Sequence, residues 1–200
     1  PQVTLHAKSA YVYDIRTGEV LFAQDEDKRL PLASLTKVMS ALVAQELGPE
    51  HSLVTVSAEA LEADGDSGLR RDELWSLKDL LDFSLISSSN DGMRAVALAL
   101  GALSRADISP DEIVNYFVGE MNEKASVLGL KNTYFWNETG LDESEVKGGA
   151  YGSARDMSTL MAHVIEEYPE LLSATKEPEV KFASLDDEIH LAKNTNSIIS

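Results

Sequence analysis

The sequence predicts an α+β fold in which helices pack on an antiparallel sheet. Runs rich in β-branched and aromatic residues occur near both ends of the chain, over residues 9–24 and from residue 179 onward. Between them lie segments with apolar residues at helical spacing. With 200 residues and 44% hydrophobic side chains, the chain is long enough for one sizeable core. We therefore expect a single domain over residues 1–200.

The first half of the chain divides clearly into elements. Residues 9–24 contain two β-rich runs joined by a polar segment that ends in Thr17-Gly18, which predicts a hairpin. Residues 35–47 are apolar around most of a helix, and Gly48-Pro49 ends it, so this helix should be central. Residues 52–57 read as a short strand. Helices are predicted over residues 76–86 and 93–100, with a polar break at 87–91 between them.

The second half contains two further helices. Ser109, Pro110 and Glu112 form the pattern of a capping box, which predicts a helix over residues 109–128. Ser153 is placed as the N-cap of another helix that should run to residue 168. The glycine-rich segment 132–152 should be a loop. Residues 179–196 suggest a second hairpin that turns at Asp186.

Composition excludes several classes of partner. The chain carries 17 Lys and Arg against 34 Asp and Glu, a formal charge of −17, so its surface should repel nucleic acid and anionic lipid. It has no cysteine, which excludes disulfides, thiolate catalysis and cysteine-based zinc sites. No apolar run is long enough to span a bilayer, and the chain does not start with a basic segment followed by an apolar one, so we expect that a signal peptide is absent or already removed. We expect a soluble form.

One lysine lies in an apolar helix, three positions after a serine. At this spacing Lys37 could take the hydroxyl proton of Ser34, provided that burial keeps the amine neutral. The same spacing occurs at Ser144/Lys147 and Ser173/Lys176, but these pairs lie in polar or broken segments and should be ordinary surface residues. Only Lys37 is followed by a full helix of core residues. Ser34 could alternatively, or in addition, serve as a helix N-cap.

A second polar cluster, Ser88-Ser89-Asn90, follows some fifty residues later. By itself it would be a turn or a helix cap. Together, Ser34-Leu35-Thr36-Lys37 and this cluster resemble the first two motifs of the penicillin-recognising serine enzymes. Segments 13–44, 84–100, 121–142 and 151–165 also look like segments of the low-molecular-mass penicillin-binding proteins, in the same order. The chain thus resembles the serine-type D-alanyl-D-alanine carboxypeptidases over most of its length.

The resemblance implies a β-lactamase/transpeptidase-like fold and a role for each motif residue. Ser34 would be the nucleophile that attacks the carbonyl of the penultimate D-Ala, and Lys37 the base. Ser88 would pass a proton to the leaving nitrogen. Asn90 would bind the substrate's backbone amide and help to hold Lys37. The scheme needs no metal, cofactor or histidine, and it implies peptidoglycan stem peptides as substrates, β-lactams as covalent inhibitors and the bacterial cell envelope as the location.

The sequence departs from this family in one respect. The third motif, Lys-Thr-Gly on a sheet strand, is absent, and "KNTN" at residues 193–196 resembles the segment that precedes it. We therefore expect that the last sheet strands are missing and that the 200 residues alone turn over substrate poorly. The chain could associate with the remainder of the protein across the open sheet edge.

Three functions remain open from the sequence. The first is a D,D-carboxypeptidase. The second is a D,D-endopeptidase or a β-lactamase on the same scaffold. Glu138 and Glu143 lie near the position where a β-lactamase needs a water-activating carboxylate, but segment 137–142, "NETGLD", resembles the carboxypeptidase loop, which argues against a β-lactamase. The third is a non-catalytic muropeptide-binding module, which the joint presence of Ser34, Lys37, Ser88 and Asn90 argues against.

Overall fold

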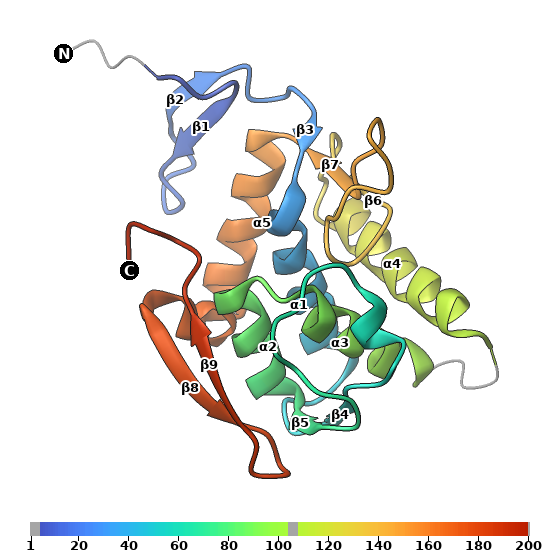
Figure 1. Cartoon of the computed structure of the whole chain (residues 1–200). Helices are drawn as coiled ribbons and strands as arrows, with labels where there is room; N and C mark the ends of the chain where they lie inside the picture. Colours follow the sequence, from blue (N-terminus) through green and yellow to red (C-terminus); the bar gives the residue numbers. More distant parts are fainter. Residues whose placement is uncertain (1–4, 104–107, 200) are drawn as a thin grey trace.

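Helices occupy the centre of the molecule and short strands lie around them (Figure 1). The structure is a computed structural model that describes residues 5–103 and 108–199. The helices are α1 (Thr36–Leu47), α2 (Leu77–Ser87), α3 (Asn90–Ala102), α4 (Pro110–Val127) and α5 (Ala154–Glu167). Short 3₁₀ turns are η1 (Ala33–Leu35), η2 (Ala60–Glu62), η3 (Pro169–Leu172) and η4 (Ala174–Lys176).

The strands form small antiparallel sheets rather than one continuous sheet. Strands β1 (Ala10–Tyr13) and β2 (Val20–Gln24) form the predicted amino-terminal hairpin. Strand β7 (Ala150–Gly152) pairs with β3 (Leu30–Pro31) and β6 (Tyr134–Phe135). Strand β4 (Leu53–Thr55) pairs with β5 (Leu74–Ser76), and β8 (Glu179–Ala183) with β9 (Ile189–Lys193). The predicted combination of helices and antiparallel strands is confirmed, although its strands are divided among these pieces.

Helix α1 is the central element of the core. Met39, Ala41, Leu42 and Ala44 are fully buried, so the helix is covered on several sides at once. It packs against α2, α3, α4 and α5. A helix that is apolar around most of its circumference can bury its surface only in this position. The prediction that residues 35–47 form a central helix is confirmed.

The hairpin β8–β9 packs on α2 through aromatic contacts. The Phe182 ring lies 6.1 Å from that of Phe83 and 6.5 Å from that of Trp75. His190 is also buried there, with its Nε2 3.1 Å from Glu73 Oε2. The sequence predicted this hairpin, and its aromatic contacts explain how the carboxy-terminal segment is held near the ends of α2.

Helix capping follows the sequence closely. Ser109 and Glu112 form the predicted capping box at α4, and the Asp156 amide donates to Ser153 Oγ at the start of α5 at 3.2 Å. Helix α3 begins at Asn90, three residues before the predicted start, so the break after α2 is shorter than expected. The prediction that residues 132–152 are a loop is wrong for β6 and β7, because strands of two and three residues produce no periodic pattern.

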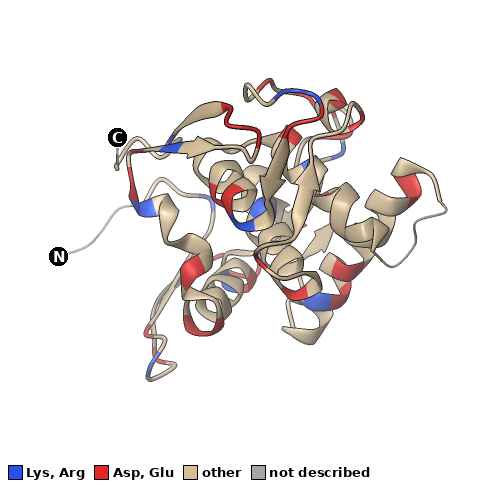
Figure 2. Ribbon diagram, turned by 90° about the horizontal axis from the view of Figure 1, so that it is seen from below, with Lys and Arg blue, Asp and Glu red and all other residues tan. Residues whose placement is uncertain are grey.

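Acidic residues are spread over the helices and loops, with Lys and Arg between them (Figure 2). This distribution fits a solvated acidic surface rather than one basic face for a polyanion. None of the helices in the described parts of the chain is long and apolar enough to cross a bilayer.

Candidate active site

Ser34 and Lys37 meet at the start of the central helix. Ser34 lies in the turn η1, directly before α1, and Lys37 lies in the first turn of α1. Lys37 Nζ donates to Ser34 Oγ at 3.1 Å. The residue before Ser34, Ala33, has a left-handed backbone with φ 46°, which is uncommon for a residue with a side chain. The backbone thus turns sharply at the point where Ser34 becomes exposed.

Ser34 is not a helix N-cap. The N-cap position of α1 is Leu35, and no side chain accepts a hydrogen bond from the backbone there. The hydroxyl of Ser34 instead contacts Lys37 and Ser88. The N-cap alternative raised from the sequence is therefore wrong. The Ser34 hydroxyl makes no capping hydrogen bond and contacts the other polar residues of the site.

Burial changes the acid–base properties of Lys37. The residue is 2% exposed, and burial lowers the pKa of its ammonium to about 8, while the nearby Glu138 carboxylate acts to raise that pKa. Lys37 Nζ also donates to the backbone carbonyl of Thr139 at 3.1 Å. A neutral amine has two N–H groups and one lone pair. If Thr139 accepts one N–H, the lone pair can face the Ser34 hydroxyl and accept its proton.

Ser88 reaches Ser34 from the junction of α2 and α3. It is the residue after α2, with a left-handed φ of 58°, and its Oγ donates to Ser34 Oγ at 2.7 Å. The next residue, Ser89, caps α3 by accepting from the Gly92 amide at 2.9 Å. Only two residues, Ser88 and Ser89, therefore separate the end of α2 from the start of α3. This tight junction directs the side chain of Ser88 toward Ser34.

Asn90 lies at the first position of α3 but does not take all of its expected contacts. Its Nδ2 donates to the Asp64 carbonyl at 2.7 Å. Among the described residues, no hydrogen bond joins Asn90 to Lys37, so the expectation that Asn90 helps to hold Lys37 is not met. Its predicted contact with a substrate amide stays a prediction.

A segment before β5 holds the junction between α2 and α3. Ser67 donates to the buried Asp91 carboxylate through both its amide, at 3.1 Å, and its hydroxyl, at 3.0 Å. The Ser67 hydroxyl also lies 2.8 Å from Ser89 Oγ. Burial raises the pKa of Asp91, and the Ser67 hydrogen bonds oppose that effect. These contacts fix the backbone that carries Ser88.

The loop after β6 supplies the carbonyl that binds Lys37. Asn137 Oδ1 accepts from the Gly140 amide at 2.7 Å, and its Nδ2 donates to the Leu141 carbonyl at 2.9 Å. Gly140 has φ +81°, and a Cβ there would lie 1.9 Å from the Ala33 carbonyl oxygen. Only glycine allows the loop to approach η1 this closely. The role of the Thr139 carbonyl cannot be predicted from the sequence, because a backbone acceptor leaves no residue signature.

A cavity of about 370 Å³ opens beside these groups. Ser34, Lys37 and Ser88 line it together with apolar side chains of α1 and α2 and residues near the carboxy-terminal hairpin. The remaining lining residues are Leu32, Leu35, Val38, Leu85, Leu172, Thr175 and Thr195. The two serine hydroxyls and the lysine amine thus face a space that can hold a small peptide segment.

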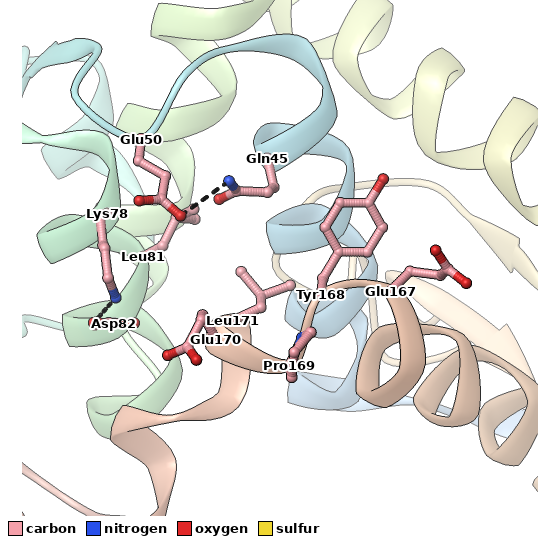
Figure 3. Close-up of a pocket in the computed structure, with 10 residues that line it drawn as sticks. All are labelled: Gln45, Glu50, Lys78, Leu81, Asp82, Glu167, Tyr168, Pro169, Glu170 and Leu171. Atoms are coloured by element: carbon pink, nitrogen blue, oxygen red, sulfur yellow. Dashed lines mark hydrogen bonds and ion pairs between the residues drawn. The ribbon is translucent and has the colours of Figure 1, made fainter. Parts of the chain in front are cut away.

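Another cavity, of about 250 Å³, lies where the end of α1 meets α2 and η3 (Figure 3). Its polar groups are mostly carboxylates, including Glu50 and Glu170, and its one lining lysine, Lys78, contacts Asp82 at 2.8 Å. None of the residues that line it is a predicted site residue. Ser34, Lys37 and Ser88 line the other cavity and not this one.

The other sequence candidates lie outside the Ser34 cavity. Ser144 and Lys147 are exposed, and Lys147 pairs with Glu143. Ser173 donates to the Glu170 carbonyl at 2.8 Å. The prediction of surface residues is confirmed for Ser144 and Lys147, whereas Ser173 is half-buried and Lys176 is exposed. None of these four residues and none of the described histidines lines the Ser34 cavity. Within residues 5–103 and 108–199, no cluster of three or more potential ligands could hold a metal ion.

Glu138 and Glu143 do not face Ser34. Glu138 is fully buried and forms an ion pair with Arg94, whereas Glu143 is exposed beside Lys147. Neither lines the cavity that contains Ser34. Among the described residues, the lining of the Ser34 cavity therefore contains no carboxylate of the kind that the β-lactamase alternative requires.

Comparison with known proteins gives a consistent result. The chain is 34% identical over 199 residues to the D-alanyl-D-alanine carboxypeptidase DacF of Bacillus subtilis, with 96% of this chain and 47% of that protein covered. It is also 34% identical to a D-alanyl-D-alanine endopeptidase of Pseudomonas aeruginosa, with 100% of this chain and 60% of that protein covered. The chain spans about half the length of the curated relatives it matches.

Solved structures share the fold. A D-alanyl-D-alanine carboxypeptidase from Mycobacterium tuberculosis superposes with a TM-score of 0.80 at 26% identity, covering 100% of this chain and 70% of that one. Penicillin-binding protein D2 from Listeria monocytogenes, solved in its ampicillin-bound form, gives a TM-score of 0.74 at 28% identity, covering 100% of this chain and 76% of that one. The sequence profile described as D-alanyl-D-alanine carboxypeptidase matches residues 1–200. The chain therefore belongs to the peptidase S11 family of D-alanyl-D-alanine carboxypeptidases.

Proposed function

We propose that the protein is a serine-type D-alanyl-D-alanine carboxypeptidase that acts on peptidoglycan stem peptides through an acyl-enzyme on Ser34. The observation that carries the proposal is the position of the Ser34 hydroxyl. It lies 3.1 Å from a buried amine and 2.7 Å from the Ser88 hydroxyl, at the wall of a cavity. Family membership and the carboxypeptidase relatives support the substrate class. The site of action would then be the bacterial cell envelope, outside the cytoplasm.

Each group has a defined chemical role in this scheme. Neutral Lys37 accepts the Ser34 proton as Ser34 Oγ bonds to the carbonyl carbon of the penultimate D-Ala. Ser88, which contacts Ser34 directly, relays the proton taken up by Lys37 to the nitrogen of the terminal D-Ala as the C–N bond breaks, so Lys37 is neutral again. Water then hydrolyses the ester and regenerates Ser34. Asn90, half-buried at the start of α3, would bind the backbone amide of the stem peptide.

The lowered pKa of Lys37 makes this assignment chemically reasonable. An amine with its ordinary pKa would be almost fully protonated near neutral pH and could accept no proton. A pKa of about 8 leaves a useful fraction neutral. Burial is the largest cause of the lowering, so the apolar surroundings of α1 are part of the proposed mechanism.

Covalent labelling tests this function directly. In the full natural protein, a fluorescent penicillin should add one adduct, detected by gel fluorescence and intact mass. Ser34→Ala and Lys37→Arg should each abolish the adduct, because one removes the nucleophile and the other replaces the base with a group that stays protonated. Ser144→Ala is the matched control, since Ser144 has the same spacing to a lysine but lies on the surface. Labelling that persists in Ser34→Ala would refute the assignment.

An endopeptidase function is the second candidate, because one relative of equal identity is a D-alanyl-D-alanine endopeptidase. The two activities differ in product. A carboxypeptidase releases D-Ala from a pentapeptide stem, whereas an endopeptidase cleaves the cross-link between two stems. Incubating the protein with purified monomeric and cross-linked muropeptides, followed by mass spectrometry, separates them. Cleavage of the cross-linked species alone would assign the endopeptidase activity.

A further inference from the structure

An ion pair with a fully buried carboxylate belongs to the loop that contacts Lys37. Glu138 has an exposed fraction of 0%, and its Oε1 lies 2.8 Å from Arg94 Nε. Arg94 lies on α3, one helical turn after Asn90, and its side chain is 29% exposed. Burying a carboxylate is costly unless it is paired. If Glu138 served only to fill space in the core, an apolar side chain would do so at a lower cost. Its charge therefore indicates a role besides packing.

The backbone around Glu138 is anchored to α1 at two places. The Glu138 carbonyl accepts from Ser40 Oγ at 2.6 Å, and the carbonyl of the next residue, Thr139, accepts from Lys37 Nζ at 3.1 Å. Ser40 and Lys37 are separated by three positions on α1, so both face the same loop. The side chain of Glu138 pairs with Arg94 on α3. The loop is therefore tied to the helix of Lys37 and to the helix of Asn90 at once.

We propose that Glu138 and Arg94 are positioning residues for Lys37: their ion pair holds the Thr139 carbonyl against the Lys37 amine and sets the charge that this amine faces. The inference rests on the proposed function, since it assigns a purpose to the acid–base state of Lys37. Neither residue lines the cavity beside Ser34. Both act on the reaction through Lys37 and do not touch the substrate.

Electrostatics gives the pair a measurable effect. Burial lowers the pKa of Lys37, and Glu138 is the charged group that acts to raise it. Burial also raises the pKa of Glu138 above its usual range, and Arg94 acts against that effect and favours the charged carboxylate. Ser34 and the Thr139 carbonyl, the other polar contacts of Lys37, carry no charge. Glu138→Gln keeps the shape but removes the negative charge, and it leaves Arg94 as an unpaired cation. The pKa of Lys37 should then fall.

Two readouts test this proposal in the full natural protein. The first is the pH dependence of acylation by a penicillin, whose rate should rise with pH about a midpoint set by Lys37. The second is the titration of Lys37 by NMR on protein with ¹³C-labelled lysine, assigned by the signal lost in Lys37→Arg. In Glu138→Gln we expect both midpoints to move to lower pH by roughly one unit. The plateau rate should fall about tenfold or more, because the Thr139 carbonyl is no longer held.

A double variant separates positioning from general damage. Adding Arg94→Gln to Glu138→Gln removes the unpaired cation, so the midpoint should return part of the way toward the wild-type value. A merely structural role predicts no such return. Arg94→Lys should retain a near-wild-type midpoint because it keeps the charge. Arg70→Gln, which removes a surface pair with Glu188 of 2.7 Å, is the matched control and should change nothing.

The outcomes are distinct. The inference is overturned if Glu138→Gln titrates like the wild type, or if the double variant lies further from the wild type than Glu138→Gln does. If Glu138→Gln does not fold, the double variant, which buries no unpaired charge, is compared with the wild type, and identical midpoints overturn the inference. If the wild type forms no adduct on Ser34, the proposed function fails, and the NMR titration alone decides the role of the pair.

Discussion

Replacing Gly140 with alanine should damage both stability and acylation. Gly140 has φ +81°, a conformation that costs a residue with a side chain about 1–2 kcal/mol. Its Cβ would also lie 1.9 Å from the Ala33 carbonyl oxygen and 2.5 Å from Thr36 Oγ1. The backbone carbonyl cannot rotate away, so the loop and η1 must separate. Such overpacking typically costs about 1–3 kcal/mol more.

Gly129 provides the matched control. It has a similar φ of +71°, but nothing lies within 4 Å of a Cβ added there. Gly129→Ala should therefore lose only the stability that the left-handed backbone costs a residue with a side chain. The difference in unfolding free energy between the two variants then measures the steric clash of the Cβ added at Gly140. Because the unfolded-state effect of alanine is the same in both, it cancels in this comparison.

Urea unfolding and acylation kinetics measure the two effects. We expect Gly140→Ala to be less stable than Gly129→Ala by about 1–3 kcal/mol, which corresponds to roughly 2–4 °C in melting temperature for each kcal/mol. Acylation should fall by up to about a hundredfold in Gly140→Ala alone, because the Thr139 carbonyl moves away from Lys37. Equal stability of the two variants, or normal acylation in Gly140→Ala, would show that neither stability nor acylation requires the loop to approach η1 so closely at Gly140.

Two further predictions concern stability. The folded state holds Lys37 at a pKa of about 8 against an ordinary 10.5, so the unfolded chain binds more protons between these values and stability should rise with pH across that window. The control is Lys37→Met, which has no amine to titrate. We expect the wild type to gain stability relative to this variant by about 3 kcal/mol at most between pH 7 and pH 10.5, measured by urea unfolding. No gain would contradict the prediction. Ser153→Ala removes the buried cap of α5 and should cost about 1 kcal/mol in the same assay, with an unchanged value arguing that the Asp156 amide finds another acceptor.

Features that depend on residues close together in the sequence were predictable, because the interactions that form them are local. The helix of Lys37 was predictable because apolar residues surround it, and the same context separated Lys37 from Lys147 and Lys176. The caps at Ser109 and Ser153 were predictable because each is satisfied within three residues. The motif Ser88-Ser89-Asn90 was found through its family pattern, and the structure places Ser88 on Ser34.

The missed features depend on contacts between distant segments. The Thr139 carbonyl is a backbone group, so no residue type identifies it. Arg94 and Glu138 are typical charged residues in the sequence, and only the packing of α3 against the loop after β6 shows that they are paired and that Glu138 is fully buried. Asn90 was expected at Lys37, but the Asp64 carbonyl competes for its amide. The division of the strands into small sheets likewise follows from tertiary packing.

The tight junctions at Ser34 and Ser88 have a consequence for folding kinetics. Ser34 and Ser88 are 54 positions apart, and Lys37 and Thr139 are 102 apart, so the site consists of contacts with high sequence separation. Such contacts form late, after most of the loop-closure entropy has been lost. An incompletely folded chain would contain Ser34 without the amine and hydroxyl that surround it. Acylation by a penicillin would therefore report completion of folding, and the nucleophile would remain unreactive until then.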